Sequence, residues 1–182
     1  MKSARTGRDG AGRDEVGQVM DSIRRIVRLL RLGSRDAERQ VGLTGAQLFI
    51  LQKLAEAKML SVNELGELTH THQSSVSVVA QTLVDRGLVA KARAADDQRR
   101  LELTLTPAAK TLLRKAPGAA QDRLIDGIKH MPAPLRKQLA KGLERLVQET
   151  GADEGEATMI FEDEPSKGTS KRRFTSSRAG RK

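Results

Sequence analysis

The sequence predicts a mainly α-helical protein with a small β-wing: a winged helix-turn-helix set between N- and C-terminal dimerisation helices. Apolar residues recur at three- and four-residue spacing through most of residues 14–150, which is the period of amphipathic helices. Within residues 65–106, a short helix, a turn and a second helix precede two β-prone runs joined by a charged tip. Aromatic residues make up only 2% of the chain, so Leu, Val, Ile and Ala must fill the core.

Charge indicates the kind of partner. The 182 residues carry a formal net charge of +10, and residues 14–150 alone hold 22 basic and 16 acidic residues. This excess favours a polyanionic partner, nucleic acid first and an anionic membrane surface second; a soluble protein with basic tails is the simpler alternative. The scarcity of aromatic side chains argues against stacking-based recognition of single-stranded nucleic acid.

Residue types that the sequence lacks exclude several kinds of site. There is no cysteine, which rules out disulfides, thiolate metal ligands and a cysteine-based redox sensor. No apolar run approaches the roughly 18 residues of a membrane span. The N-terminus also lacks the apolar core of a signal peptide. We therefore expect a cytoplasmic protein with no membrane partner.

The first part of the chain predicts a long helix. Residues 1–13 are basic and show no apolar period, so we expect a disordered arm there. Residues 14–43 have an Arg-rich face and, opposite it, a seam like that of a coiled coil. The seam consists of Val16, Met20, Ile23, Val27, Leu30, Ala37 and Val41. A core helix within one subunit would show the same seam, but its length fits a homodimer slightly better.

Residues 44–106 contain the predicted winged helix-turn-helix. Thr44-x-x-Gln47 and Ser61-x-x-Glu64 are capping-box patterns that each open a helix. The turn is His70-Thr71-His72, and the second helix of the motif runs from about Gln73 to Arg86, with Gly87 as its stop. Four apolar residues of that helix fall on one face and should point inward: Val76, Val79, Ala80 and Leu83.

The outward face of this helix is short and uncharged. A helix that is merely solvated usually carries more Glu and Lys, whereas one that enters a major groove needs small side chains and an amide for a base edge. The two β-prone runs, Leu88–Arg93 and Arg100–Leu105, add a compact basic group for phosphates. The candidate DNA-binding residues are Gln73, Ser74, Ser75, Ser77, Val78, Gln81, Lys91, Arg93, Asp97, Arg99 and Arg100. A solvated hairpin with ordinary charges is the alternative for the wing.

Residues 107–150 complete the predicted dimerisation region. Thr106 is the expected N-cap of a helix that extends from Pro107 to about His130, with a kink at Pro117-Gly118 as the simplest outcome and a break as the alternative. A final helix follows Pro132-Ala133-Pro134, and we expect the terminal helices to pack together within and between subunits. Residues 151–182 hold six acids and then seven basic residues, which predicts a disordered tail. Its basic end could add nonspecific DNA affinity or fold back on the acidic block.

Three segments resemble the MarR family of bacterial transcription regulators. Asp97-Gln98-Arg99 followed by Leu103–Thr106 resembles the D-x-R…[VL]-x-L-T signature of that family's wing. Residues 83–89 resemble the end of its recognition helix, and Leu43-Thr44-x-x-Gln47 resembles the opening of its second helix. The resemblance covers roughly residues 15–150. The chain departs from the pattern at His70, where Gly is common, and in having no Lys or Arg between Gln73 and Asp85.

The resemblance implies a triangular homodimer in which each subunit offers one winged helix to DNA. Asp97 would orient the wing, and Arg99 would reach the minor groove beside the site of the recognition helix. The implied function is a sequence-specific, duplex-DNA-binding transcription regulator on a pseudo-palindromic operator, a repressor responsive to a small ligand. The ligand-binding residues stay unknown: Arg24, Arg25 or Arg28 could line such a pocket, although we favour their facing solvent.

No catalytic or metal site is predicted, and no cofactor. His70 and His72 lie close together but lack further ligands, so they are interpreted as turn or capping residues. No Ser-His-Asp arrangement, phosphate loop or apolar pocket with paired carboxylates is visible, which argues against an enzyme. The alternative function is a winged-helix module for protein interaction or for nonspecific nucleic-acid binding.

Overall fold

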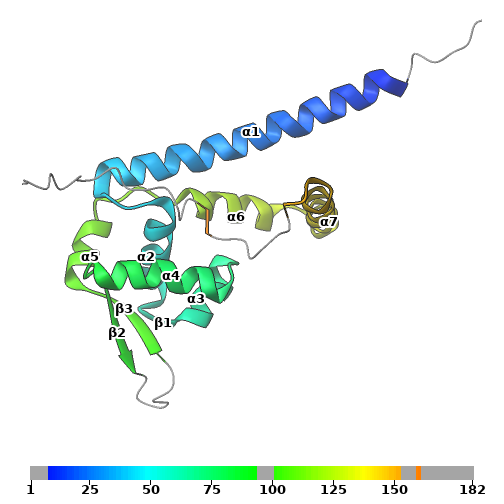
Figure 1. Ribbon diagram of the computed structural model, residues 1–182. Helices are drawn as coiled ribbons and strands as arrows, with labels where there is room; N and C mark the ends of the chain where they lie inside the picture. Colours follow the sequence, from blue (N-terminus) through cyan, green and yellow to red (C-terminus); the bar gives the residue numbers. More distant parts are fainter. Residues whose placement is uncertain (1–7, 94–100, 153–158, 161–182) are drawn as a thin grey trace, which may run out of the picture.

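The computed structural model describes residues 8–93, 101–152 and 159–160, with side chains from Asp14 onward. Helices dominate, and the strands form one small sheet (Figure 1), so the predicted fold class is confirmed. The elements are α1 Arg8–Val41, α2 Gly45–Ala57, β1 Met59–Ser61, α3 Val62–Thr69, α4 Gln73–Asp85, β2 Val89–Arg93, β3 Leu101–Leu105, α5 Pro107–Leu113, α6 Ala120–His130 and α7 Ala133–Thr150.

The sheet has three antiparallel strands in the order β1-β3-β2. The pairing of β2 with β3 forms the predicted hairpin, from Val89 opposite Leu105 to Arg93 opposite Leu101. Strand β1 is an addition: the sequence predicted two strands, and the three residues before α3 pair with the other edge of β3. Its central residue, Leu60, is buried opposite Leu103, so β1 closes the core at the base of the wing.

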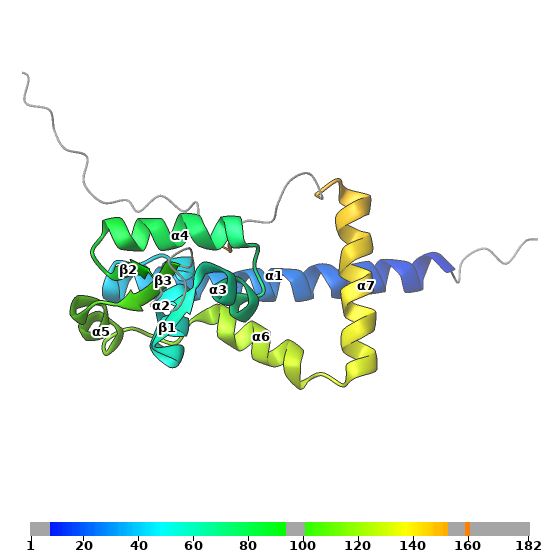
Figure 2. The same cartoon turned by 90° about the horizontal axis from the view of Figure 1, so that it is seen from below.

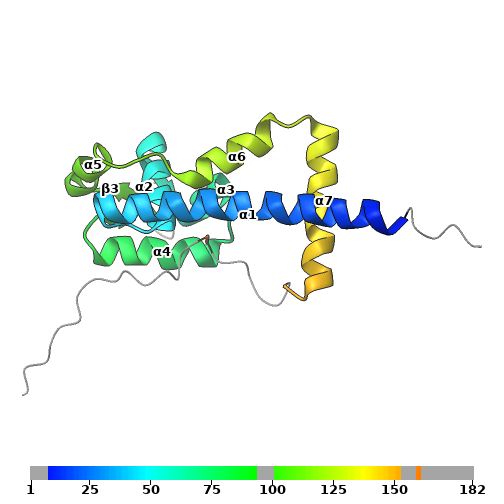
Figure 3. The same cartoon turned by 90° about the horizontal axis from the view of Figure 1, so that it is seen from above.

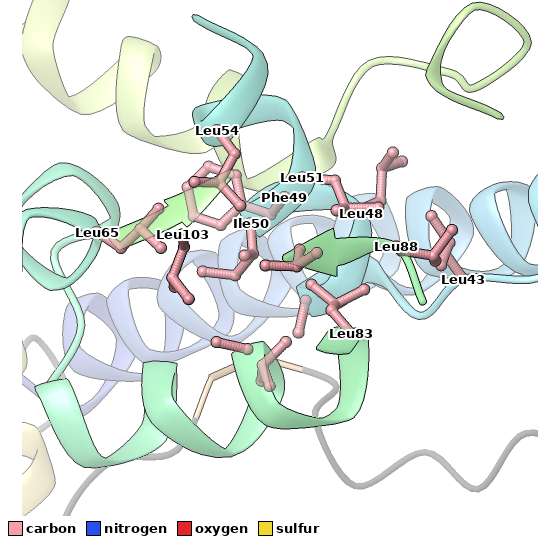
Figure 4. Packing of buried hydrophobic residues seen from close by; sticks show 14 of the residues in the cluster. Leu43, Leu48, Phe49, Ile50, Leu51, Leu54, Leu65, Leu83, Leu88 and Leu103 are labelled. Carbon is pink, nitrogen blue, oxygen red and sulfur yellow. The ribbon is translucent and has the colours of Figure 1, made fainter. Parts of the chain in front are cut away.

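Helix α2 lies at the centre of the core (Figure 4). Its residues from Leu48 to Leu51 are all buried, because α1, α3, α4, α6 and the sheet all contact it. The expected capping box opens the helix: Thr44 Oγ1 accepts from Gln47 N at 3.2 Å, and Gln47 Oε1 accepts from Thr44 N at 3.3 Å. The winged helix is therefore built around a helix that has almost no exposed face.

Helix α1 is longer than predicted and projects beyond the core (Figure 1). It begins at Arg8, so the expectation of a disordered arm through residue 13 is wrong for residues 8–13, which continue the helix. Its C-terminal part packs against α2 and α6 through Leu30, Ser34 and Ala37, all buried. At Gly33 the contact with α6 is so close that a Cβ would lie 2.5 Å from that of Ala120.

The helix predicted from Pro107 to His130 is broken rather than kinked. Helix α5 ends at Leu113 and α6 begins at Ala120. Gln52 of α2 holds the link between them: its Nε2 donates to the Pro117 carbonyl at 2.7 Å, and its Oε1 accepts from Ala119 N at 2.9 Å. A proline inside a helix interrupts the backbone hydrogen bonds of that helix. The two bonds from the Gln52 side chain take their place at this break.

Helix α7 crosses the projecting part of α1 and buries none of its residues (Figure 2). Its apolar side chains Leu135, Leu139, Leu143, Leu146 and Val147 are all exposed. The N-terminal seam is exposed as well at Val16, Met20 and Val27. Large apolar side chains on both terminal helices thus remain without a partner among the described residues.

The chain returns to the core after α7. Gly151 ends that helix in the left-handed conformation, at φ 64°. Met159 is only 4% exposed and belongs to the core cluster, so the expectation of a disordered tail is wrong at residues 159–160. The neighbouring carbonyl of Ile160 accepts a hydrogen bond from Gln121 Nε2 at 3.4 Å.

Candidate nucleic-acid interface

The turn between α3 and α4 is fixed by His70 and Gly66. His70 takes the left-handed conformation at φ 53°, which a glycine would adopt with less strain. Thr71 N donates to the Gly66 carbonyl at 3.0 Å, and a Cβ on Gly66 would lie 2.9 Å from the Thr71 carbonyl oxygen. The two helices can cross this closely only because residue 66 has no side chain. His70 and His72 occupy the C-cap and N-cap positions, as interpreted from the sequence.

Helix α4 divides into the predicted two faces. Val76, Val79, Ala80 and Leu83 are buried against the core. Gln73, Ser74, Ser77, Val78 and Gln81 are exposed on the other side. Val78 is 57% exposed, which gives the outward face an apolar centre that could contact a thymine methyl group.

Ser75 does not belong to the exposed face. It is 6% exposed, which disfavours its predicted contact with DNA. The reason is its position one turn before Val79 and next to Val76, which carries it over the inward edge of the helix.

Lys91 of β2 connects the wing to the recognition helix. Its Nζ donates to Gln81 Oε1 at 2.5 Å, while Gln81 Nε2 donates to Asp85 Oδ1 at 2.7 Å. Lys91 and Gln81 are both exposed, and the sequence placed both at the interface without indicating that they bond to each other. An ammonium group therefore lies against the outward face of α4, although the helix itself has no cation from Gln73 to Asp85.

The wing is described only at its base. Arg93 is the last described residue of β2 and is exposed, with an interaction of its own. The other predicted wing contacts, Asp97, Arg99 and Arg100, lie outside the described residues. Their roles stay predictions.

A groove of about 300 Å³ lies between the start of α3, the start of α4 and the hairpin. Gln73, Ser77 and Lys91 line it, as does Asn63, which the sequence interpretation overlooked. The capping box at Ser61 could have indicated Asn63, because it places Asn63 in the first turn of α3, next to the strand that precedes the helix. Asn63 adds a polar group at the edge of the candidate interface.

Arg86 fastens the far end of α4. Its guanidinium donates to Gln47 Oε1 at 2.7 Å and to the Gly42 carbonyl at 2.9 Å. The recognition helix is thus held at both ends, by the glycine-dependent turn and by Arg86. Side chains on a helix fixed in this way lose little orientational freedom on binding.

An apolar groove of about 770 Å³ lies away from the wing, between the projecting part of α1 and helices α6 and α7. Its lining is almost wholly apolar and includes Val19, Ile23, Ile26, Leu124, Ile128, Met131, Leu139, Leu143 and Leu146. An exposed apolar surface of this size is typical of an interface between subunits.

Other kinds of site find no support in the part of the chain that the structure describes. No group of three or more His, Asp or Glu side chains there could hold a metal ion. None of the described helices is both long and apolar enough to cross a membrane.

Comparisons with known proteins find a family match over the segment that contains the candidate interface. Residues 41–100 match the model of the MarR family. A curated relative, the HTH-type transcriptional repressor MdtR of Bacillus subtilis (strain 168), is 35% identical over 65 residues. That match covers 36% of this chain and 42% of the relative, so the chain spans less than half the length of the curated relative it matches.

Solved structures resemble a larger part of the chain. A probable transcriptional regulator from Pseudomonas aeruginosa is 27% identical, with a TM-score of 0.50 over 73% of this chain and 97% of its own. Sco3205, a MarR family transcriptional regulator from Streptomyces coelicolor solved in complex with DNA, is 21% identical, with a TM-score of 0.54 over 82% of this chain and 92% of its own. At that identity the second likeness shows a shared fold.

Proposed function

We propose that this chain, whose residues 41–100 match the MarR family, is a homodimeric transcription regulator of that family that binds a pseudo-palindromic operator in duplex DNA. Members of the family are transcription regulators rather than enzymes. One observation carries the proposal: the uncharged outward face of α4 has the Lys91 ammonium bonded to it through Gln81. This arrangement combines a base-reading amide with a phosphate-binding cation on one rigid surface.

Dimerisation is the second part of the proposal. The apolar groove between α1, α6 and α7 supports it, because leaving the groove in water would cost free energy in proportion to its apolar area. A twofold dimer would present two α4 helices, and its half-sites would lie about one turn of DNA apart, roughly 10 base pairs. The curated relative is a transcriptional repressor, and we propose repression for this chain as well.

Response to a small ligand is the third part. A shallow, open groove of about 670 Å³ lies where the end of α1 meets α5, lined by Gln40, Val41, Pro107, Ala108, Thr111, Leu112 and Lys115. Lys115 at its edge would favour an anion. Because this groove lies between α1 and α5, a ligand there could change the distance between two recognition helices.

The test is a selection for bound sequences from a pool of random duplex DNA. We expect enrichment of one inverted repeat, and binding of that site by a dimer in light-scattering measurements. Leu139→Glu with Leu143→Glu should yield monomers that no longer select the repeat. The matched control, Lys137→Glu with Lys141→Glu, changes the opposite face of α7 and should leave the dimer intact. A pool that enriches no motif contradicts the proposal.

A second candidate is binding of nucleic acid without sequence preference. The observation that favours it is that both polar atoms of the Gln81 side chain are already bonded, to Lys91 and Asp85. Affinity would then come from charge, much of it in residues 165–182. If a chain that lacks these residues still binds one defined operator at moderate salt, this candidate is excluded.

A further inference from the structure

Helix α1 carries a row of arginines along one face, called here the arginine row. Its members are all exposed and line one shallow groove together with Val27 and Leu32; they are Arg24, Arg28, Arg31 and Arg35. No acid among the described residues forms an ion pair with any of the four. Other arginines of the helix are paired. Arg25 lies 2.8 Å from Asp21, and Arg39 lies 2.5 Å from Asp36.

The arginine row faces away from the rest of the molecule. At about 100° per residue, Gly33 lies about 160° around the helix from both Arg31 and Arg35. Gly33 is in close contact with α6, so the row is on the far side of α1 from that helix. Ile26 lines the apolar groove and lies about 140–160° from Arg28 and Arg31. A dimer that covers the apolar groove would therefore leave the row exposed.

The arginine row is long enough to contact several phosphates of one DNA strand. From Arg24 to Arg35 it extends about 17 Å along the helix axis, at roughly 1.5 Å per residue. Phosphates of one strand recur about every 3.4 Å along a duplex, so this length corresponds to about five of them. The four positions also fall within a band about 60° wide around the helix, which presents them to one partner.

A DNA duplex suits this face better than a membrane surface does. A helix that lies on a membrane buries an apolar face in the lipid beside its basic residues. Most of the large apolar side chains of α1 line the groove with α6 and α7 instead, on the far side from the row. The charges are also arginines, whose planar guanidinium groups bind phosphate oxygens two at a time. The row is therefore suited to duplex phosphates.

The arginine row and the wing lie on opposite sides of the protein. The hairpin of β2 and β3 projects from the end of the molecule remote from α1 (Figure 1). Seen from the side of α1 (Figure 3), this helix crosses in front of the other helices. DNA has a persistence length of about 150 base pairs, so a short duplex does not bend around the protein to contact both surfaces.

We propose that the arginine row is a second DNA-binding face, which holds the phosphate backbone of another duplex without base preference. With one duplex on the wing and one on the row, the protein bridges two segments of DNA. Bridging rests on the proposed function, because it needs a duplex at the wing. Binding by the row does not, so the two are measured separately.

Salt dependence tests the row by itself. The probe is a duplex of random sequence, and the protein carries Lys91→Met and Arg93→Met, which weaken binding at the wing. Adding Arg28→Gln with Arg31→Gln should lower the slope of log affinity against log salt by about 2 in magnitude, one for each phosphate contact.

The matched control is Arg25→Gln with Arg39→Gln. It removes the same charge from the same helix, but from arginines that are already paired with acids, and should leave the slope nearly unchanged. Equal changes of slope by the two pairs would mean that net charge alone attracts DNA, and would overturn the proposal. A random pool that enriches no motif, together with a slope that still falls by about 2, would contradict the proposed function and support the row.

Capture of a second duplex tests bridging. A duplex fixed to beads is loaded with protein that has an unsubstituted wing, and a labelled duplex of the same sequence is added. We expect the beads to retain the label. Arg28→Gln with Arg31→Gln should leave the protein on the beads but reduce the retained label about fivefold or more, since phosphate contacts are lost. Equal retention by the variant would show that two wings of a dimer hold both duplexes, and would overturn bridging by the row.

Two other partners would each give a different result. Vesicles of phosphatidylserine and phosphatidylcholine test a membrane surface, and light scattering tests a second copy of the chain. Vesicle binding that requires Arg28 and Arg31, with an unchanged slope for DNA, would overturn the proposal. So would a row variant that becomes monomeric while the control pair stays dimeric. Cooperative thermal unfolding of each variant confirms that it is folded.

Discussion

Lys91 Nζ lies 2.5 Å from Gln81 Oε1, which joins the first cation of the wing to the amide of the recognition helix. The bond spans ten residues of sequence and bridges the α4 helix and the β2 strand. Gln81 in turn donates to Asp85, so Lys91, Gln81 and Asp85 form one polar chain on the exposed surface. The side chains of the wing and of α4 are therefore linked in the free protein.

Lys91→Met should weaken binding to every duplex by a similar factor. A lysine that contacts a phosphate contributes affinity without base preference, so the ratio between operator and random DNA should stay nearly constant. The slope of log affinity against log salt should fall in magnitude by about 1. Titrations at several salt concentrations measure both quantities. Lys137→Met, which removes a charge from α7, is the control and should leave the slope unchanged.

Gln81→Ala should instead relax base preference at one position in each half-site. If the amide reads a base, its loss reduces discrimination there by about 1–3 kcal/mol while other positions keep theirs. Competition between operator variants with single base changes measures this effect. Thr82→Ala is the matched control, because the Thr82 hydroxyl is bonded to its own helix at the Val78 carbonyl. Uniform weakening at all positions would show that Gln81 only positions Lys91.

Local patterns in the sequence predicted most of the helix-turn-helix. Caps at Thr44, Ser61 and Thr106 depend on side chains three residues apart at most, and all three are present. The inward face of α4 follows from helical periodicity alone. The general position of Gln81 and Lys91 could be predicted in the same way, since one lies on an exposed helix face and the other on a wing strand.

Features that depend on distant contacts were not predictable. Strand β1 is only three residues long and forms because β3 offers it an edge. The break between α5 and α6 is held by Gln52, which lies 65 residues before Pro117. Met159 lies in a short apolar run, Met159–Phe161, within a polar tail, and its burial in the core depends on residues far away in the sequence. Ser75 lies at the border between two helix faces, where periodicity alone does not decide.

Gly33→Ala should destabilise the protein even though alanine favours helices. The new Cβ would lie 2.5 Å from the Cβ of Ala120, so α1 and α6 must move apart. Overpacking of this kind costs about 1–3 kcal/mol, which exceeds the roughly 1 kcal/mol that alanine gains over glycine in a helix. Urea unfolding measures the net loss.

Two further variants test the origin of that loss. Gly17→Ala lies in the same helix with no atom within 4 Å of the new Cβ, and should stabilise by about 0.5–1 kcal/mol. Ala120→Gly added to Gly33→Ala moves the methyl group from one helix to the other and should recover part of the stability. No recovery would mean that the cost arises elsewhere than at this contact.

Lys53 links α2 to α6, and its ionisation should make the free energy of unfolding fall at alkaline pH. Its Nζ lies 2.7 Å from Asp122 Oδ1 and 3.0 Å from Glu56 Oε2, and its side chain is 13% exposed. Burial alone would lower the pKa of Lys53, but hydrogen bonds to Asp122 and Glu56 outweigh it and raise the pKa above the ordinary 10.5. A pKa raised by folding means that the folded state holds the proton more tightly. The resulting stability is complete below pH 10.5 and is lost as pH rises through the folded pKa.

Lys53→Met should therefore cost about 1–2 kcal/mol of unfolding free energy at pH 7, where the pair is fully charged. Above pH 10.5 the difference in unfolding free energy between the two chains should shrink. The unsubstituted chain then loses the charge on Lys53, which the variant already lacks. Urea unfolding of both chains at pH 7, 9 and 11 isolates this effect from the other titrating lysines, which the chains share. Arg25→Met is the control: its pair with Asp21 is largely exposed, so the change should stay below about 0.5 kcal/mol. A Lys53→Met difference that stays constant to pH 11 would show that the side chain stabilises by burying its methylene groups rather than by its charge.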